Sequence, residues 1–430
     1  MTSSKLGLAS LFAPLLVLAG CAGTGELTPE GGADDDDSAT LTYYADVEPI
    51  VDRWCSRCHR PDGPGSMDFT DPGLVALMAE NMLARIDAGE MPPPAADPDC
   101  RPYWGHEELT LPLEARDTFA TWVEQDTPMG DPSDSIVDGS STTNFTLEDA
   151  DLELRIPTPY VPTFADPSDP GNEYRCFAME HGRDEDFYIT GLAPLLDAEK
   201  LVHHIVLFRI GEDDLWPNYD PDQGVDCIDD MDESVLGMIA GWAPGAVPIE
   251  FPQDTGIKIL ANQRIGIQIH YFQNGEAGLA DQTGYAFRTA TEVDDEVRLV
   301  PVGTSSFTIP AGDDSYTRSG SWGMPLGLTP IVHGVFPHMH VLGKSFSMWR
   351  ESANGDSECM VDMPEYEFDN QQSYLFEWPM ELEPNDRIHF SCTWDNSADN
   401  PDQFYDPPRD VRYGERTDEE MCFGFTFIQL

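Results

Sequence analysis

Two histidines stand one residue apart in a segment that otherwise has the composition of a β-strand. His338 and His340 lie in the apolar run GVFPHMHVLGKSF, in a chain with only 10 histidines. Side chains two apart on a strand project from the same face, so we expect both imidazoles to point at one spot. Histidine is a frequent metal ligand, and this spacing predicts half of a metal site. The alternative is an ordinary pair of core or surface histidines.

A second chemical motif lies nearer the N-terminus, where Cys55, Cys58 and His59 form C-x-x-C-H. The two thiols of such a motif can add to the vinyl groups of one haem while the histidine binds the haem iron. The motif therefore predicts one covalently bound haem c. The alternative is a C-x-x-C redox or zinc pair, although a second pair of zinc ligands at suitable spacing is missing.

Four methionines downstream of this motif are candidates for the sixth iron ligand. Met78 and Met82 stand four apart in a helix-like segment, which favours a place in the core. Met91 lies in GEMPPP, where consecutive prolines stiffen an extended loop, and we prefer it to Met67. The region 41–130 resembles a class I c-type cytochrome, and this resemblance implies a His/Met-ligated haem suited to electron transfer.

The second half of the chain supplies more ligands of the same kind. His203 and His204 lie in KLVHHIVLFRI, His270 lies in GIQIHYF, and Met421 lies in DEEMCFGF. Imidazole suits copper, and a thioether sulfur favours Cu(I). Three histidines in one half, and two histidines with a methionine in the other, predict two copper ions.

The order of these motifs resembles the copper type II, ascorbate-dependent monooxygenases, the family of dopamine β-monooxygenase and peptidylglycine α-hydroxylating monooxygenase. Over residues 149–430 the chain has HH, W-A-P-G, I-H-Y, H-x-H-x-x-G and E-E-M-C in the order of that family. The segments AGWAPGAVPIEFP, IQIHYFQNGEAGLADQTGYAF and FSCTWDNS favour its dopamine-type branch. The resemblance implies an electron-transfer copper on His203, His204 and His270, and an oxygen-binding, catalytic copper on His338, His340 and Met421.

Strand geometry restricts how the adjacent histidines can share one ion. His203 and His204 would face opposite sides of a regular strand, so the metal must lie at a strand edge or the backbone must bulge. The remaining histidines match no ligand position, and we expect structural or surface roles for His106, His181, His333 and His389.

Six cysteines remain outside the haem motif and the N-terminal region. The family resemblance pairs Cys392 with Cys422 and Cys176 with Cys227. Cys100 and Cys359 are left over, and they form a third disulfide or stay free.

The resemblance also bears on the substrate. Peptide-amidating members of the family carry an arginine two residues before H-x-H and a tyrosine four residues after the ligand methionine, whereas this chain has Phe336 and Phe425 there. A peptide carboxylate would lose its charged partner, which disfavours amidation. Phenylalanine at both positions favours a small apolar or aromatic substrate.

The N-terminus predicts a targeting signal followed by a tether. Residues 1–20 contain the apolar run LGLASLFAPLLVLAG and end before Cys21, and LAGC resembles a bacterial lipobox. That resemblance implies lipidation of Cys21 and a place in the bacterial cell envelope, facing the periplasm or the exterior. Residues 21–40 are acidic and rich in Gly and Asp, which predicts a flexible tether.

The rest of the chain predicts a multidomain fold, a small all-α cytochrome c domain followed by two all-β jelly-roll-like sandwich domains. The expected cytochrome spans 41–130, a Pro- and Gly-rich linker spans 131–148, and the two β-sandwiches span 149–300 and 301–430. The 79 acidic and 23 basic residues give a net charge of −56, which excludes nucleic acid as a partner.

These features together predict a lipid-anchored haem–copper monooxygenase that hydroxylates a C–H bond with O2. Its expected partners are O2, a small substrate and an electron donor to the haem, and it meets the membrane only through its lipid. One alternative is a non-catalytic electron-transfer or copper-handling lipoprotein on the same scaffold. Another is a haem-based sensor with a degenerate β region.

Overall fold

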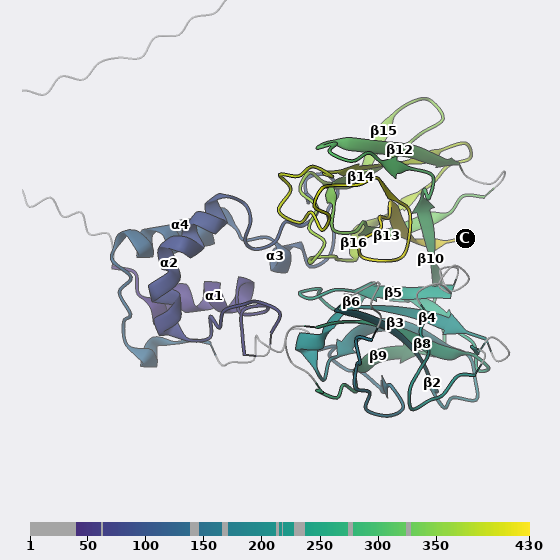
Figure 1. Cartoon of the computed structure of the whole chain (residues 1–430), viewed down its shortest axis with the longest axis horizontal. Coiled ribbons are helices and arrows are strands. Elements are labelled where there is room, and N and C mark those ends of the chain that lie inside the picture. The colour runs from purple at the N-terminus through teal and green to yellow at the C-terminus, as the bar shows by residue number, and fades with distance from the viewer. Residues whose placement is uncertain are drawn as a thin grey trace, which may run out of the picture. The chain divides into compact units, whose positions relative to one another are not determined.

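Helices occupy the first part of the described chain and strands occupy the rest (Figure 1). The computed structural model describes residues 40–61, 63–137, 146–165, 171–211, 215–216, 218–227, 237–273, 278–323 and 328–430, and Thr40–Leu430 form one unit. The predicted signal segment, Cys21 and nearly all of the tether lie outside the described residues. Within them, no helix combines the length and apolar character needed to cross a membrane.

The helical part has its own apolar core. Its elements are η1 (Tyr43–Val47), α1 (Glu48–Trp54), α2 (Pro72–Asp87), α3 (His106–Leu109), α4 (Leu113–Glu124) and η2 (Pro132–Asp134). The helix α2 begins where the Asp71 carboxylate accepts a hydrogen bond from Gly73 N, with proline in its first turn. Met82 is buried in the core, as its spacing predicted, together with Phe119 and Trp122 of α4.

The β part contains one large sheet and three smaller ones. Its strands are β1 (Leu152–Arg155), β2 (Asn172–Met179), β3 (Phe187–Leu195), β4 (Val202–Ile210), β5 (Met238–Trp242), β6 (Ile249–Glu250), β7 (Thr255–Ile259), β8 (Arg264–Phe272), β9 (Gly284–Ala290), β10 (Asp295–Gly303), β11 (Thr308–Ile309), β12 (Tyr316–Gly323), β13 (Ile331–His338), β14 (Gly343–Glu351), β15 (Ser357–Met363), β16 (Tyr374–Glu381), β17 (Arg387–Trp394), β18 (Val411–Arg412) and β19 (Phe423–Gln429). A short turn of helix, η4 (Glu199–Leu201), leads directly into β4.

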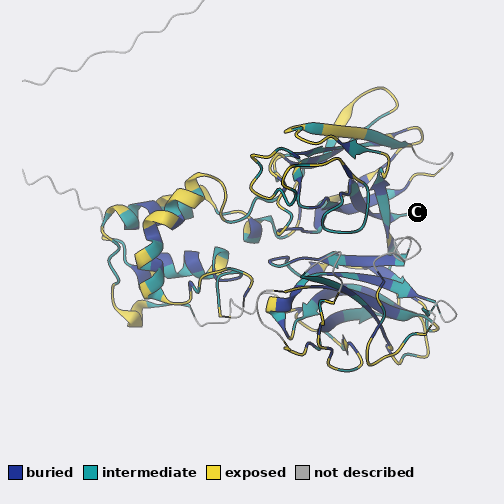
Figure 2. Cartoon of the chain, viewed as in Figure 1, coloured by how far each residue is buried: buried dark blue, intermediate teal, exposed yellow. Residues whose placement is uncertain are grey.

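Two layered β regions share one nine-stranded sheet, ordered β1-β9-β3-β7-β10-β19-β13-β16 with β6 beside β3. The antiparallel sheet β2-β8-β4-β5 packs on its first half, and the sheet β12-β17-β14-β15 packs on its second half. Buried residues gather in the facing layers of both regions (Figure 2), as in β-sandwiches. The mostly β architecture agrees with the sequence expectation.

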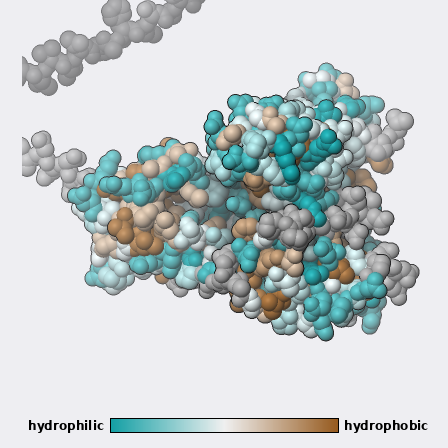
Figure 3. Space-filling view, viewed as in Figure 1, coloured by the Kyte–Doolittle hydropathy of each residue, from teal (hydrophilic) through white to brown (hydrophobic). Residues whose placement is uncertain are grey.

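The predicted boundary between residues 300 and 301 falls inside β10. This strand pairs in parallel with β7 at Asp295 and Glu296, and antiparallel with β19 along Val297 to Gly303. The two β regions are therefore joined by backbone hydrogen bonds as well as by side-chain packing. Hydrophilic residues cover much of the face viewed in Figure 3, as the large negative charge requires.

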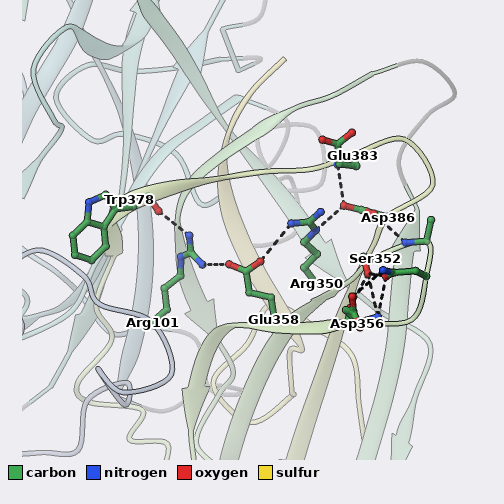
Figure 4. Close-up of polar contacts among 10 residues, drawn as sticks. Arg101, Arg350, Ser352, Asp356, Glu358, Trp378, Glu383 and Asp386 are labelled. Atoms are coloured by element: carbon green, nitrogen blue, oxygen red, sulfur yellow. Dashed lines mark hydrogen bonds and ion pairs between the residues drawn. The ribbon is translucent and has the colours of Figure 1, made fainter. Parts of the chain in front are cut away.

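A disulfide fixes the segment between the helices and the second β region. Cys100 is bonded to Cys359 of β15, so the pair left open by the sequence is joined. Next to it, Arg101 donates to the Glu358 carboxylate at 2.8 Å and to the Trp378 carbonyl at 2.7 Å (Figure 4). Glu358 also meets Arg350, whose guanidinium donates to the buried Asp386 carboxylate. The structure also contains the disulfides Cys176–Cys227 and Cys392–Cys422.

Replacing Cys100 and Cys359 together with serine should lower the denaturant midpoint, because the disulfide restricts the unfolded chain. The expected loss is about 2–4 kcal/mol of unfolding free energy. Chemical unfolding followed by fluorescence measures it. The control is Glu358→Gln, which removes a half-exposed ion pair worth about 0–1 kcal/mol. Equal midpoints for the serine pair and the wild type would show that the disulfide does not stabilise this attachment.

Candidate metal centres

Three imidazoles converge through the same ring nitrogen. His203 and His204 lie on β4, and His270 lies opposite them on β8. His204 Nδ1 lies 3.3 Å from His203 Nδ1 and 3.2 Å from His270 Nδ1. Among the described residues, these three form the group of His, Cys or acidic side chains able to hold a metal ion. Nitrogen atoms that converge in this way can share one metal ion.

The Nε2 atoms, which point away from the centre of this cluster, have partners that set the tautomer a metal requires. His270 Nε2 lies 2.8 Å from Asn172 Oδ1, and His203 Nε2 lies 3.3 Å from Asp369 Oδ1. Both oxygens are acceptors, so each Nε2 carries the hydrogen and leaves the lone pair on Nδ1. The His270 ring also stacks on Tyr174 at 4.2 Å between ring centres, which holds its plane.

A β-bulge brings the two adjacent histidines to one place. In the pairing of β4 with β8, Val202 stands opposite Tyr271 and His204 opposite His270, and the register shifts between them. His203 is the extra residue of this bulge. One of the two arrangements predicted for the HH pair is therefore confirmed.

The H-x-H pair forms a second cluster at the end of a strand. His338 is the last residue of β13, while His340 lies beyond it, so the prediction that both lie within a strand is wrong. Tyr366 stops the strand here, because its hydroxyl bonds both the backbone N and the carbonyl of Met339. The two imidazole centres are nevertheless 5.1 Å apart.

This second cluster presents the other ring nitrogen. His338 Nδ1 lies 2.6 Å from Gln371 Oε1, and the Gln371 amide is oriented by donating its Nε2 to the Phe368 carbonyl. His340 Nδ1 donates to the Glu419 carbonyl at 3.0 Å. Both Nδ1 atoms carry the hydrogen, which leaves the Nε2 lone pairs free for a metal.

A buried carboxylate connects the backbone of two candidate ligands. Glu420 Oε2 accepts from His340 N at 2.9 Å, from Met421 N at 3.2 Å and from Trp394 Nε1 at 2.8 Å, and Oε1 accepts from Leu342 N at 2.8 Å. Burial raises the pKa of Glu420 to about 7, against the opposing effect of these N–H donors. Met421 is also fixed by its neighbour Cys422, which is bonded to Cys392.

Burial lowers the pKa of four of these histidines and so favours their neutral form, which is the form that binds metals. It lowers the pKa of His338 to about 4 and that of His340 to about 3. The pKa values of His204 and His270 lie well below the ordinary histidine value, first because of burial and then because of neighbouring histidines. At neutral pH no proton competes with a metal for these nitrogens.

The two clusters meet at one cavity. A space of about 60 Å³ is lined by His204 from the first cluster and by His338, His340 and Met421 from the second. The Phe368 ring lies 5.4 Å from the His203 ring and 6.0 Å from the His340 ring, so one aromatic side chain contacts both clusters. The remaining walls are mostly apolar and include Trp242, Phe336 and Phe425.

The C-x-x-C-H residues line a second, larger cavity of about 970 Å³. Its walls include Cys55, Cys58 and His59, and also Met91. Met67, Met78 and Met82 line the same cavity, so position alone does not select one sulfur. Gly65 is required beside the motif, because a Cβ there would lie 2.6 Å from His59 Nδ1.

The sequence singled out the ligands but missed the residues that orient them. Asn172, Asp369 and Gln371 lie in no motif, and no local pattern distinguishes them from other polar residues. Glu420 could have been noticed, since it stands directly before Met421 in a run of acidic residues.

The other four histidines lie in neither cluster. His333 bonds Gln429, His389 stacks on Trp349, His181 accepts from Arg183 N and His106 contacts the Tyr103 carbonyl. These contacts are structural, as expected.

Comparison with known proteins bears on the first cluster directly. Residues 161–277, which contain His203, His204 and His270, match the family described as copper type II ascorbate-dependent monooxygenase, N-terminal domain. The mouse DBH-like monooxygenase protein 2 is 26% identical over 249 residues, which cover 53% of this chain and 38% of the relative. The matched region therefore covers less than two fifths of that relative's length. Both are similarities to copper type II monooxygenases, and the family match falls on the part of the chain that holds the first cluster.

Replacing Glu420 with glutamine should weaken copper binding at the second cluster. The amide would put an N–H₂ group where an acceptor is needed, leaving a buried donor unpaired at a cost of about 1–3 kcal/mol. Loss of an orienting partner of this kind typically lowers metal affinity about 10–100-fold. Copper titration of the metal-free protein measures it.

The matched control is Glu419→Gln, because that side chain does not bond the ligand backbone. Copper bound at the first cluster should stay unchanged in both variants. Equal affinity of the second site in the two variants would contradict the role given to Glu420.

Proposed function

We propose that the chain is a haem-coupled copper monooxygenase that hydroxylates a C–H bond of a small apolar or aromatic substrate with O2. The observation that carries the proposal is the single cavity lined by ligands of both clusters, His204 on one side and His338, His340 and Met421 on the other. One cluster offers three imidazoles and the other two imidazoles with a thioether. This donor set suits copper, and the thioether favours Cu(I).

The residues around the two clusters prepare them for copper. Copper bound there would supply one-electron redox chemistry and the activation of O2. The chain supplies neutral imidazoles, fixed tautomers and a buried Met421 sulfur, all preorganised by contacts outside the ligands. The apolar walls exclude water from the place where substrate and O2 would meet.

The lining of the shared cavity disfavours a substrate carboxylate, and its aromatic side chains suit an apolar or aromatic compound. Phe336 and Phe425 are buried, and Phe336 also packs against Gly241 of the first β region. Among the described lining residues there is no arginine or lysine. A substrate carboxylate would be buried there without a cationic partner, which is costly.

The larger cavity, lined by the C-x-x-C-H residues, has the size and the free thiols that a covalently attached haem would need. Cys55 and Cys58 are not disulfide-bonded, and a volume of about 970 Å³ is at the upper end of pockets that hold organic cofactors. Arg57 lines the cavity with 6% of its surface exposed, and its Nε and Nη2 have no hydrogen-bond partner. A buried guanidinium of this kind is costly unless a polar group of whatever fills the cavity reaches it.

The thiols do not fit the alternative of a redox pair. Burial raises the pKa of Cys55 to about 12 and also raises that of Cys58, whereas reactive thiols have lowered pKa values. A haem bound by Cys55, Cys58 and His59, with Met91 as sixth ligand, would supply a one-electron carrier.

Lipidation of Cys21 remains part of the proposal. Its support is the apolar segment that ends in LAGC, followed by an acidic run without the apolar residues needed for a core. The anchor would hold the protein at a membrane of the bacterial envelope, where an electron donor reaches the haem.

Replacing Met91 with leucine should remove the methionine–iron charge-transfer band and lower the haem potential, because the thioether is replaced by an apolar side chain. Absorption spectroscopy and redox titration of the purified protein test this. Met67→Leu is the matched control, since Met67 lines the same cavity and is 38% exposed against 41% for Met91. A band that survives in Met91→Leu and disappears in Met67→Leu would reassign the ligand.

Replacing Met421 with leucine should abolish hydroxylation while the fold and the first copper site are kept. The side-chain volume is nearly conserved, so only the soft ligand is lost, at a stability cost below about 1.5 kcal/mol. Copper content, and oxygen uptake with a library of apolar and aromatic compounds, are the measurements. Met238→Leu is the control, because Met238 lines the same cavity and is equally buried. Wild-type turnover in Met421→Leu would exclude the thioether from the chemistry.

A further inference from the structure

The two adjacent histidines of the first cluster face different cavities. His203 lines the large cavity that contains Cys58 and His59. His204 lines the small cavity that contains His338 and His340. The bulge at His203 brings both imidazoles to one metal position, while each ring still borders its own cavity. The first cluster therefore stands between the haem cavity and the second cluster.

A nearly buried ion pair holds the C-x-x-C-H loop next to this cluster. Arg60 follows His59 directly, and its guanidinium donates to both Glu199 carboxylate oxygens, at 3.0 and 2.8 Å. The two side chains are only 16% and 19% exposed. Glu199 begins η4, the turn that leads into β4 and His203. A bidentate pair of this kind sets geometry as well as adding energy.

Two more contacts join the helical part to the β part beside this cluster. A Cβ at Gly245 would lie 3.1 Å from Cys58 Sγ, so the absence of a side chain there allows close approach, and its φ of +81° suits glycine. Asn370 donates to the carbonyls of Pro93 and Pro94, next to the predicted ligand loop. Its neighbour Asp369 contacts His203 Nε2.

We propose that His203 is the electron entry point of the copper centre and that the Arg60–Glu199 pair holds the helical part in place as a built-in electron donor. This inference rests on the proposed function. In each transfer, ferrous haem iron is oxidised to the ferric state and cupric copper on His203, His204 and His270 is reduced to the cuprous state. One electron crosses His203, and no other co-reactant is consumed. An external one-electron donor reduces the haem again.

The test exchanges the two charges of the pair and measures electron transfer from haem to copper in the absence of hydroxylation. Arg60→Glu, Glu199→Arg and the combined swap are prepared as full-length holoprotein, and the reduced haem is followed by anaerobic stopped flow as it reduces cupric copper. Each single variant should transfer electrons about tenfold more slowly, and the swap should recover most of the loss, as coupled positions do. Haem content and copper content should match the wild type in all three, and the haem potential is measured in each, because a reversed charge beside His59 shifts it and the rates are compared at equal driving force.

Arg53→Glu is the control. Arg53 forms a half-exposed pair with Glu108 on the same helical part, and it does not line the large cavity. It should transfer at the wild-type rate. If a charge reversal prevents folding, Arg60→Met and Glu199→Gln remove the pair without reversing a charge, and each should still slow the transfer.

Single variants that transfer at the wild-type rate would overturn the role of the pair, while leaving the proposed function intact. A wild-type protein that binds haem and copper but passes no electron between them would overturn this inference and the haem coupling together. Slow transfer in both single variants, recovered by the swap, supports it.

Discussion

The bulge at His203 is the local feature on which the arrangement of both cavities depends. A regular β4 would send His203 and His204 to opposite faces of the sheet, and His270 could then join only one of them. With one extra residue, three Nδ1 atoms meet while the two rings border separate cavities. The bulged strand is held by β8 on one side and β5 on the other, so the metal position is built on rigid elements and not on a loop.

Hydrogen bonds outside the ligands then decide which nitrogen each cluster presents. Asn172 and Asp369 take the Nε2 hydrogens of the first cluster, whereas Gln371 and the Glu419 carbonyl take the Nδ1 hydrogens of the second. Two of these partners, Asp369 and Gln371, belong to the single connection between β15 and β16. That connection also carries Phe368, which touches both clusters, and Asn370, which reaches the proline loop of the helical part. This one loop therefore contacts both histidine clusters and the proline loop of the helical part.

The sequence singled out the candidate ligands because each lies in a motif with its own spacing, and it predicted either a strand edge or a bulge for the HH pair. It did not predict that β13 ends between His338 and His340, because the hydroxyl that stops the strand comes from Tyr366, far along the chain. The parallel pairing of β7 with β10, which joins the two β regions, is likewise a long-range contact without a local signature. The orienting residues Asn172 and Gln371 act through position alone, so only the folded chain identifies them.

The measurement that tests the central claim most directly is a single turnover with isotopically labelled O2. The protein, with haem and both copper ions fully reduced and no other reductant present, is mixed with labelled O2 and the library compound that best stimulates oxygen uptake. The two cuprous ions supply the two electrons of the reaction, so the proposal predicts hydroxylated product carrying one labelled oxygen atom, the second atom in water, and oxidation of the haem as it then returns one electron to the oxidised copper centre. Reduced metal centres that are oxidised without labelled product, or product formed while the haem stays reduced, would contradict it.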